Sequence, residues 1–327
     1  MTTAFAFSTD ENYVGLTAVA LHTLMSHNPG AHAAILADRV SSASRELLLG
    51  VAERAGGSAE IADASSPLEE IKSIGAESYV SFSAYARLFL PKLLGRRFDR
   101  IVYLDSDTVV TAPLDSLSSF DLGGKPFAIG YDCICNRYKK LIGLSPERPY
   151  FNSGVLVIDP ARWADRNATE RILGYMRDVR HDLMFGDQDY FSLVLADEAA
   201  ILHPRYNFLT HFQMFQSASD ARLAMDIPEK CWYGDSEYAE ARRSPAIRHF
   251  LGHTLGRPWY RQSLNPLRGL YRRLAAEAGL PHVAEQSRPV EACYRVQWIC
   301  WKLLPRPLFV RACRAMYRYF FRSAYGV

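Results

Sequence analysis

Cysteine is scarce in this chain, with six in 327 residues, which excludes a disulfide framework and favours a reducing compartment. No stretch reaches the roughly 18 uninterrupted apolar residues that a membrane-spanning helix needs. The first residues lack the basic segment and the long apolar core of a signal peptide, so a cytoplasmic protein is expected. Internal repeats and Gly/Ser linkers are also missing. What is present is a hydrophobic fraction of 49%, which excludes intrinsic disorder.

The formal net charge of +3 conceals an asymmetry along the chain. Residues 257–327 carry 13 Lys and Arg against 3 Asp and Glu, whereas the remaining residues carry 25 against 32. An acidic body with a basic, aromatic tail indicates that the tail meets a negatively charged partner.

Short apolar runs alternate with helical patterns over most of the chain, and each run is expected to form a strand. Strands are expected at residues 3–7, 33–37, 59–62, 101–104, 127–130, 155–158 and 246–250, and helices at 85–94, 160–180 and 187–196. The alternation predicts an α/β fold whose central sheet is mostly parallel and flanked by helices. Because the composition changes near residue 260, we expect a main domain over 1–260 and a helical tail over 261–327.

The segment Asp105-Ser106-Asp107 directly follows the apolar run 101–104. Two carboxylates separated by one residue can both reach one cation if the strand ends in a turn. The alternative is a solvated turn without a ligand. The apolar residues on both sides favour a cation, because carboxylates between two buried runs need a compensating charge.

Other polar side chains also follow expected strands, among them Asp10, Asn12, Asp132 and Asn152, while His249 lies within the last strand. Ligands of open α/β sheets gather beyond the carboxyl ends of the strands. Carboxylates that face one another there repel, and a divalent cation removes the repulsion. Two carboxylates and one imidazole suit Mn²⁺ or Mg²⁺ better than a metal that prefers thiolates. For His249 the alternative is a hydrogen-bonded core histidine.

Six short motifs occur in order along the chain. They are Asp10-Glu11-Asn12-Tyr13, Tyr85-Ala86-Arg87-Leu88, Tyr103-Leu104-Asp105-Ser106-Asp107, Phe151-Asn152-Ser153-Gly154-Val155, Asp187-Gln188-Asp189 and His249-Phe250-x-Gly252. With these motifs the chain resembles glycosyltransferase family 8, the retaining GT-A enzymes that include bacterial lipopolysaccharide galactosyl- and glucosyltransferases. The resemblance covers roughly residues 3–260. It implies a Rossmann-like GT-A domain that moves galactose or glucose from a UDP-sugar to a saccharide hydroxyl of a glycolipid or glycan.

The resemblance also implies which residues bind the donor nucleotide. A metal that bridges the diphosphate acts as a Lewis acid for its departure. The implied metal ligands are Asp105, Asp107 and His249, the implied ion is Mn²⁺ with Mg²⁺ as the alternative, and the implied uridine and ribose contacts are Asp10, Asn12 and Tyr13. Ser106 is implied as a further donor contact. For Asp10 and Asn12 a helix N-cap is the competing interpretation.

Arg87 lies in a segment of otherwise apolar character, where a buried guanidinium needs an anionic partner. The resemblance implies that Arg87 binds the donor region, and a structural ion pair is the alternative. Asn152, Asp187 and Gln188 match sugar-contacting positions, and the last two are the implied catalytic pair. Because an amide is a poor nucleophile, we favour front-face attack, in which the leaving phosphate oxygen takes the acceptor's proton. An N-cap and first helical turn is the alternative for residues 187 and 188.

The segment after His249 departs from the family pattern. The family usually has Gly-x-x-Lys-Pro-Trp, whereas this chain has the longer run Gly252-His253-Thr254-Leu255-Gly256-Arg257-Pro258-Trp259. Gly252 and Arg257 are expected to contact the donor, since an arginine can hold a diphosphate bidentately. Asp132 matches an acceptor-side position.

The tail carries a basic stripe. Arg311, Arg314, Arg318 and Arg322 are spaced by three or four residues and therefore share one face of a helix. Basic amphipathic helices with Trp and Phe lie in the headgroup region of anionic membranes, so we expect peripheral attachment to the inner face of the cell membrane. A helical cap packed on the enzyme's own body is the alternative. Nucleic acid is not an expected partner, because no module that reads it accompanies the charge.

Two other functions compete with sugar transfer. Asp105-Ser106-Asp107-Thr108-Val109 also fits the nucleophile motif of haloacid-dehalogenase-type phosphatases, in which Asp105 would attack phosphorus. That motif usually lies near the start of a domain, whereas about a hundred residues precede it here. The other alternative is a non-catalytic membrane-peripheral protein, and the presence of both aspartates and the histidine argues against it.

Overall fold

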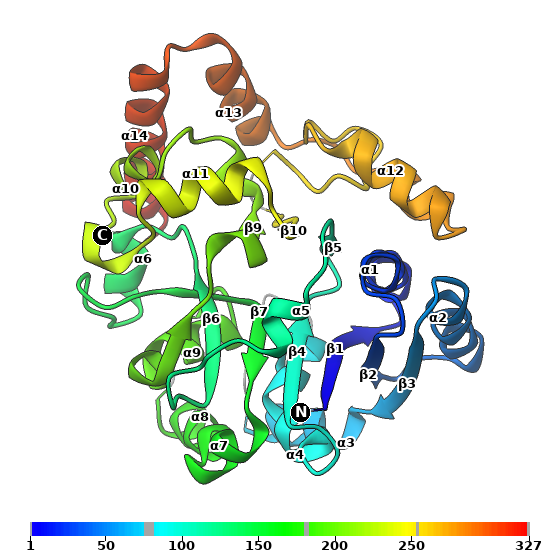
Figure 1. The fold of residues 1–327 in the computed structure, drawn as a ribbon. Helices are drawn as coiled ribbons and strands as arrows, with labels where there is room; N and C mark the ends of the chain where they lie inside the picture. The colour runs from blue at the N-terminus through cyan, green and yellow to red at the C-terminus, as the bar shows by residue number, and fades with distance from the viewer. Residues whose placement is uncertain (1, 75–81, 180–182, 253–254, 326–327) are drawn as a thin grey trace. The chain divides into compact units, whose positions relative to one another are not determined.

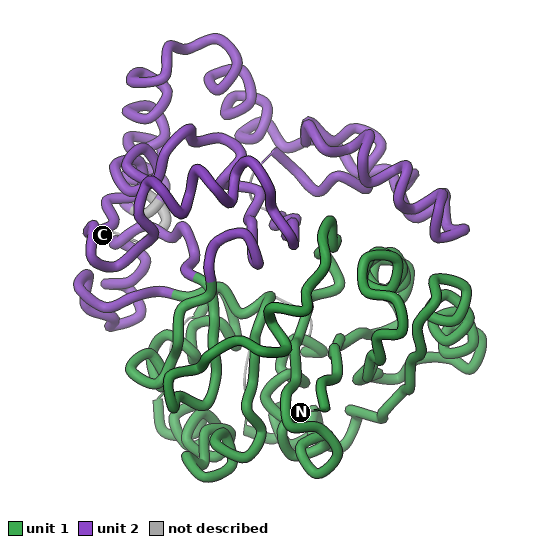
Figure 2. Tube along the Cα trace, viewed as in Figure 1, with its two compact units in different colours: residues 1–130, 151–202 green, residues 131–150, 203–327 purple. Residues whose placement is uncertain are grey.

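The computed structural model describes residues 2–74, 82–179, 183–252 and 255–325. The chain divides into two compact units, which Figure 2 distinguishes by colour. Unit 1 comprises residues 1–130 and 151–202, and unit 2 comprises residues 131–150 and 203–327. The chain therefore leaves unit 1 after Gly130, returns at Phe151 and leaves again after Leu202.

A seven-stranded sheet of order β3-β2-β1-β4-β7-β6-β8 forms the centre of unit 1 (Figure 1). The strands are β1 (Thr3–Asp10), β2 (His32–Asp38), β3 (Ser58–Asp63), β4 (Arg100–Leu104), β6 (Phe127–Tyr131), β7 (Phe151–Ile158) and β8 (Ala199–Ile201). Pairing is parallel between β1 and β2, β1 and β4, β2 and β3, and β6 and β8, whereas β7 runs antiparallel to β4. The predicted α/β fold with a mostly parallel sheet is confirmed.

The central strands β4 and β7 are buried at every residue. Strands covered on both faces carry continuous apolar runs rather than alternating ones, which explains the runs at 101–104 and 155–158. The second strand begins earlier than expected, at Phe151, so Asn152 lies within β7 and not after a strand. The remaining elements of unit 1 are α1 (Val14–His27), α2 (Ser42–Arg54), α3 (Ser65–Ser73), the 3₁₀ helix η1 (Phe82–Phe89), α4 (Leu90–Leu94), β5 (Thr108–Val110), α5 (Asp115–Ser118), α7 (Pro160–Asp165), α8 (Ala168–Asp178), α9 (Asp187–Val194) and the 3₁₀ helix η2 (Ala196–Glu198).

Two of the expected helices differ from the prediction. The first half of the segment 85–94 belongs to the 3₁₀ helix η1 and the second half is α4, which starts beside Pro91, a residue without an amide hydrogen for a continuous helix. The segment 160–180 forms two helices, α7 and α8, because Asn167 between them adopts a left-handed backbone with φ of 49°. The expected end of that segment, Arg180, lies outside the described residues.

Unit 2 is mainly helical. Its elements are α6 (Asn136–Leu141), η3 (Pro204–Tyr206), β9 (Phe208–Leu209), η4 (Thr210–Gln213), α10 (Ala218–Met225), η5 (Glu229–Cys231), α11 (Asp235–Arg243), β10 (Ile247–His249), α12 (Arg268–Glu277), η6 (Pro281–Glu285), α13 (Ala292–Leu303) and α14 (Arg306–Tyr325). The short strands β9 and β10 pair in parallel, with His249 beside Leu209. Phe212, Trp232 and Tyr238 form a buried aromatic core with ring centroids 5.3 to 5.8 Å apart.

The tail forms the predicted helices, and α14 packs against α10 within unit 2 (Figure 1). The rings of Phe215 and Phe309 lie 6.0 Å apart. Two arginines of the basic stripe bind one carboxylate, because Arg314 Nε lies 2.7 Å from Asp226 Oδ1 and Arg318 Nε lies 3.0 Å from Asp226 Oδ2. One face of the tail thus packs on the protein itself, as in the alternative interpretation of the stripe. Across the described part of the chain, no helix has both the length and the apolar character to cross a bilayer.

Candidate active site

The Asp105-Ser106-Asp107 segment leaves the carboxyl end of β4 in a tight turn. The amide of Asp105 donates to the carbonyl of Gly154 at 2.8 Å, and the amide of Thr108 donates back to the carbonyl of Asp105 at 3.2 Å. Thr108 Oγ1 binds the same carbonyl at 2.7 Å. The strand therefore ends in the turn that places two carboxylates beyond a sheet edge.

Arg87 is the charged centre of unit 1. Its guanidinium Nη2 lies 2.8 Å from Asp105 Oδ1, and its Nε lies 3.1 Å from Asp187 Oδ2. Nη1 donates to the carbonyl of Ser153 at 2.6 Å. The Arg87 side chain is only 4% exposed, so burial works against its charge, but the two carboxylates outweigh burial and raise its pKa. The structural ion pair that was the alternative role of Arg87 is present. Its two partners, Asp105 and Asp187, are themselves implied donor contacts.

Asp187 stands in the first turn of α9 and is buried. Burial raises the pKa of its carboxyl to about 6, with the charge of Asp105 adding to the rise and that of Arg87 opposing it. The N-cap position of α9 is held by Gly186, and no side chain caps that helix end. Of the alternative for residues 187 and 188, the first-turn part is confirmed and the N-cap part is wrong, and the Asp187 carboxylate lies beside Arg87.

Asn152 and Gln188 meet within unit 1. Asn152 Nδ2 donates to Gln188 Oε1 at 3.0 Å, and Asn152 Oδ1 accepts from the amide of Gly154 at 3.1 Å. Both side chains are nearly buried, with relative exposures of 2% and 7%. The pair is thereby held in one mutual orientation.

The loop after β1 is stabilised by its own carboxylates. Asp10 Oδ1 accepts from the amides of Asn12 at 2.9 Å and Tyr13 at 3.2 Å, immediately before α1 begins. These bonds form a turn ahead of the helix. The N-cap of α1 is Tyr13 and no side chain caps that helix end, so the N-cap interpretation of Asp10 and Asn12 is wrong. Glu11 accepts from the amide and hydroxyl of Ser41, which fastens the loop to the start of α2.

Ser106 is turned into the protein rather than outward. Its hydroxyl donates to the carbonyl of Ser8 at 3.0 Å and lies 2.7 Å from Thr17 Oγ1. A donor contact of Ser106 stays a prediction.

In unit 2, His249 is 2% exposed at the end of β10. Its Nδ1 lies 3.0 Å from Asn207 Oδ1, an acceptor, so Nδ1 carries a proton and, in the neutral imidazole, Nε2 carries the lone pair. This hydrogen bond gives His249 the tautomer that a metal ligand needs. It is also what a satisfied core histidine has, so the bond alone does not separate the two interpretations.

The other predicted residues of unit 2 are held locally. The Arg257 side chain packs closely against Gly252. A Cβ at residue 252 would lie only 3.1 Å from Arg257 Nε, so this packing depends on the glycine. The Arg257 guanidinium also lies 5.3 Å from the Trp259 ring centroid. Asp132 is buried, and its carbonyl accepts from Trp232 Nε1 at 2.9 Å. Part of the lengthened loop, residues 253–254, lies outside the described residues.

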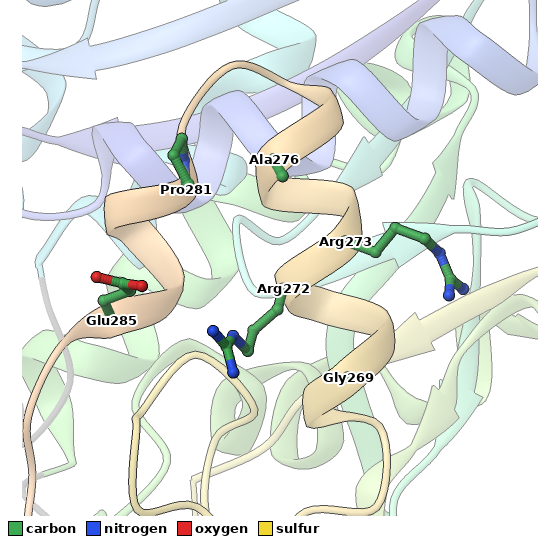
Figure 3. Close-up of a pocket in the computed structure, with 6 residues that line it drawn as sticks. All are labelled: Gly269, Arg272, Arg273, Ala276, Pro281 and Glu285. Atoms are coloured by element: carbon green, nitrogen blue, oxygen red, sulfur yellow. The ribbon is translucent and has the colours of Figure 1, made fainter.

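A surface pocket lies between α12 and η6 in unit 2 (Figure 3). Its lining residues are Gly269, Arg272, Arg273, Ala276, Pro281 and Glu285. None of these is a predicted site residue, so the pocket does not bear on the candidate active site.

The sequence did not indicate two residues that orient site groups. Tyr103 donates its hydroxyl to Asp105 Oδ1 at 2.6 Å, and Asn207 fixes the ring of His249. For Tyr103 a signal was present, because a phenol inside a fully buried strand needs a polar partner. Asn207 carried no comparable signal, since its pairing with His249 depends on the register of β9 and β10.

The family model described as glycosyl transferase family 8 matches residues 4–263. The chain belongs to this family. Membership in family 8 confirms the resemblance drawn from the six motifs and disfavours the phosphatase alternative.

Among the similar proteins, General stress protein A of Bacillus subtilis is 28% identical over 197 residues, which are 59% of this chain and 65% of the relative. Lipopolysaccharide 1,2-glucosyltransferase of Escherichia coli K12 is 28% identical over 189 residues, 57% of this chain and 52% of the relative. These matches span only about half to two thirds of the relatives' lengths.

Solved structures share the fold at low sequence identity. Galactosyltransferase LgtC, in complex with donor and acceptor sugar analogs, aligns with a TM-score of 0.66 and 20% identity over 90% of this chain and 99% of its own. Glycosyltransferase GlyE of Streptococcus pneumoniae aligns with a TM-score of 0.58 and 19% identity, over 98% of this chain and 64% of its own. The GT-A-like α/β fold is thereby confirmed.

Proposed function

We propose that this chain is a retaining glycosyltransferase that moves a hexose, galactose or glucose, from a UDP-sugar to a hydroxyl of lipopolysaccharide or another glycolipid or glycan. The observation that carries the proposal is the buried bridge Asp105–Arg87–Asp187, which joins three residues of separate family motifs. Membership in family 8 and the E. coli relative named for lipopolysaccharide glucosyl transfer support the same activity.

The proposal includes a divalent cation, Mn²⁺ or Mg²⁺, held by Asp105, Asp107 and His249. These side chains offer two carboxylates and one imidazole, a donor set of the kind that holds such ions. The fit is supported within each unit, because Asp105 is oriented by hydrogen bonds and His249 has its lone pair on Nε2. When bound, the cation neutralises negative charge on the departing nucleoside diphosphate.

The remaining predicted residues receive roles in donor and acceptor binding. Asp187, Asn152 and Gln188 bind the hexose, with the Asp187 carboxylate accepting from sugar hydroxyls. The other proposed donor contacts are Asp10, Asn12 and Tyr13 at uridine and ribose, Arg257 at the diphosphate, and Ser106 and Gly252. Asp132 is the proposed acceptor contact.

We assign a front-face mechanism. An amide is a poor nucleophile, and Gln188 Oε1 already accepts a hydrogen bond from Asn152 Nδ2. The acceptor hydroxyl attacks the anomeric carbon on the face from which the diphosphate leaves, and a phosphate oxygen takes the proton. Configuration is retained because the new bond forms on the face where the old one breaks.

The tail is proposed to rest on the inner face of the cell membrane. Apolar side chains are exposed along α13 and the start of α14, with 47% exposure at Ile299, 76% at Leu303 and 49% at Leu308. Lys302 and Arg311 flank them on the same helices. Each basic residue near an anionic surface contributes about 1 kcal/mol of attraction, so exposed apolar and basic groups together support peripheral binding.

The experiment is a screen of UDP-sugars for UDP release with lipopolysaccharide core acceptors, with and without Mn²⁺. The expected result is release with UDP-galactose or UDP-glucose that stops in chelator and in Asp107→Asn and His249→Ala variants. Glu277→Gln is the matched control, an exposed acid on α12. Phosphomonoester hydrolysis without a UDP-sugar, or unchanged transfer by D107N, would overturn the proposal.

A further inference from the structure

A buried network of hydroxyl groups surrounds Tyr103 in unit 1. The Tyr103 hydroxyl donates to Asp105 Oδ1 at 2.6 Å and lies 2.8 Å from Ser8 Oγ, which therefore donates to it. The ring is fully buried in β4. Arg87 Cζ lies 4.5 Å from the ring centroid, so the guanidinium stacks on the same phenol.

Two donors converge on one oxygen of Asp105. Besides the phenol, Arg87 Nη2 approaches Oδ1 at 2.8 Å. Two hydrogen bonds from different directions to one oxygen restrict rotation of the carboxylate about its Cβ–Cγ bond. The backbone of the same turn is also fixed, since Ser106 Oγ donates to the carbonyl of Ser8.

The same phenol links the two ends of the Arg87 bridge. Arg87 pairs with Asp105 through Nη2, and its Nε, which donates to the carbonyl of Ala84, lies 3.1 Å from Asp187 Oδ2 in an ion pair. The Tyr103 ring lies under the same guanidinium. Tyr103 thus contacts Asp105 directly and Asp187 through Arg87. Groups that orient a metal ligand set its affinity, and losing one typically costs about 10- to 100-fold.

We propose that Tyr103 is a positioning residue whose hydroxyl orients the Asp105 carboxylate for the divalent cation. The inference rests on the proposed function, in which Asp105 is a metal ligand. Tyr103 itself touches neither the cation nor the sugar in this role.

The test measures binding of Mn²⁺ alone to the full chain, by electron paramagnetic resonance of the free ion, without donor or acceptor. Tyr103→Phe keeps the ring under Arg87 and removes the hydroxyl. Ser8→Ala is the matched control, because it breaks the same Ser8–Tyr103 hydrogen bond and leaves the phenol bound to Asp105. Circular dichroism reports whether each variant is folded.

If Y103F does not fold because Ser8 is left without an acceptor, the double variant S8A/Y103F takes its place, compared with S8A. Removing both partners of a buried hydrogen bond disturbs folding less than removing one. The effect of the Tyr103 hydroxyl is then the ratio of the Mn²⁺ dissociation constants of S8A/Y103F and S8A.

The expected result is an Mn²⁺ dissociation constant raised about tenfold in Y103F and unchanged in S8A. Equal losses in Y103F and S8A, or no loss in Y103F, overturn the positioning role. Asp105→Asn separates this failure from that of the proposed function. If D105N binds Mn²⁺ as the native chain does, the proposed metal site is wrong. If D105N binds Mn²⁺ more weakly while Y103F binds it as the native chain does, only the positioning role of Tyr103 is refuted.

Discussion

Asn152 Nδ2 donates to Gln188 Oε1 across 3.0 Å, in a site where both side chains are almost fully buried. Asn152 is itself anchored, because its own oxygen accepts from the amide of Gly154. The carbonyl oxygen of Gln188 is therefore engaged, and the amide is held rather than presented as an attacking group.

Replacing Gln188 with Ala tests the mechanism. Front-face attack needs no covalent bond to this residue, so we expect kcat to fall about 100- to 1000-fold, as for loss of a positioned polar contact, and not to vanish. The anomeric configuration of the product, read by proton NMR, is expected to stay retained. Complete loss of turnover with normal donor binding would instead indicate a glycosyl intermediate on Gln188.

Replacing Arg87 with Ala is expected to destabilise the protein strongly. The change leaves the carboxylates of Asp105 and Asp187 without the guanidinium with which both are paired. We expect this to lower the free energy of unfolding by about 3 to 5 kcal/mol. Arg97→Ala is the control, because Arg97 pairs with Glu60 at 49% and 33% exposure, where a pair contributes about 1 kcal/mol or less. Urea unfolding measures both, and similar losses in the two variants would contradict the central role of the Arg87 bridge.

Asp187 predicts a pH dependence of stability. Its pKa is raised to about 6 in the folded state, against about 3.9 in an unfolded chain. The folded state thus binds more protons between these values, so the contribution of Asp187 is present below about pH 4 and is lost as pH rises through about 6.

The variant Asp187→Asn does not titrate and should not show this loss. In chelator, the unfolding free energy of the native chain is expected to fall relative to D187N by about 2 to 3 kcal/mol between pH 4 and pH 7. Thermal melts across this range check the sign. A difference that stays constant with pH, or grows in favour of the native chain, contradicts the raised pKa.

The pairing of Asp226 with Arg314 and Arg318 predicts that this carboxylate helps to hold α14 against the rest of unit 2. Burial raises the pKa of its carboxyl, but hydrogen bonds from Arg318 and Arg314 outweigh that effect and lower it. Asp226→Asn removes the charge that both arginines share, which at this partial exposure amounts to about 1 kcal/mol. Limited proteolysis is expected to cut α14 faster in D226N than in the native chain or in the exposed control E277Q, and equal rates would show that apolar packing alone holds the helix.

Much of unit 1 could be predicted because its central strands contain uninterrupted apolar runs. The strands β5 and β9 could not, since elements of three and two residues carry no periodic signal and are determined by tertiary pairing. The break at Asn167 was hidden for a similar reason, because the flanking helices α7 and α8 read as one pattern.

The candidate site could be predicted as a set of residues but not as a set of contacts. Motif order identified Arg87, Asp105 and Asp187, and the structure adds that one guanidinium binds both acids. Which side chains orient the others depends on strand register. Tyr103 and Asn207 acquire their partners only once the neighbouring strands are aligned.

The path of the chain between the units constrains the order in which the protein can be made. Strand β7, which covers the flank of β4, follows the excursion 131–150 and is translated after it. While residues 151–202 are still inside the ribosome, strands β3, β2, β1 and β4 lack their neighbour β7. The backbone groups along that edge of β4 are then unpaired and can bind another strand. We therefore expect the edge of β4 to be the part of the nascent chain that a chaperone has to protect.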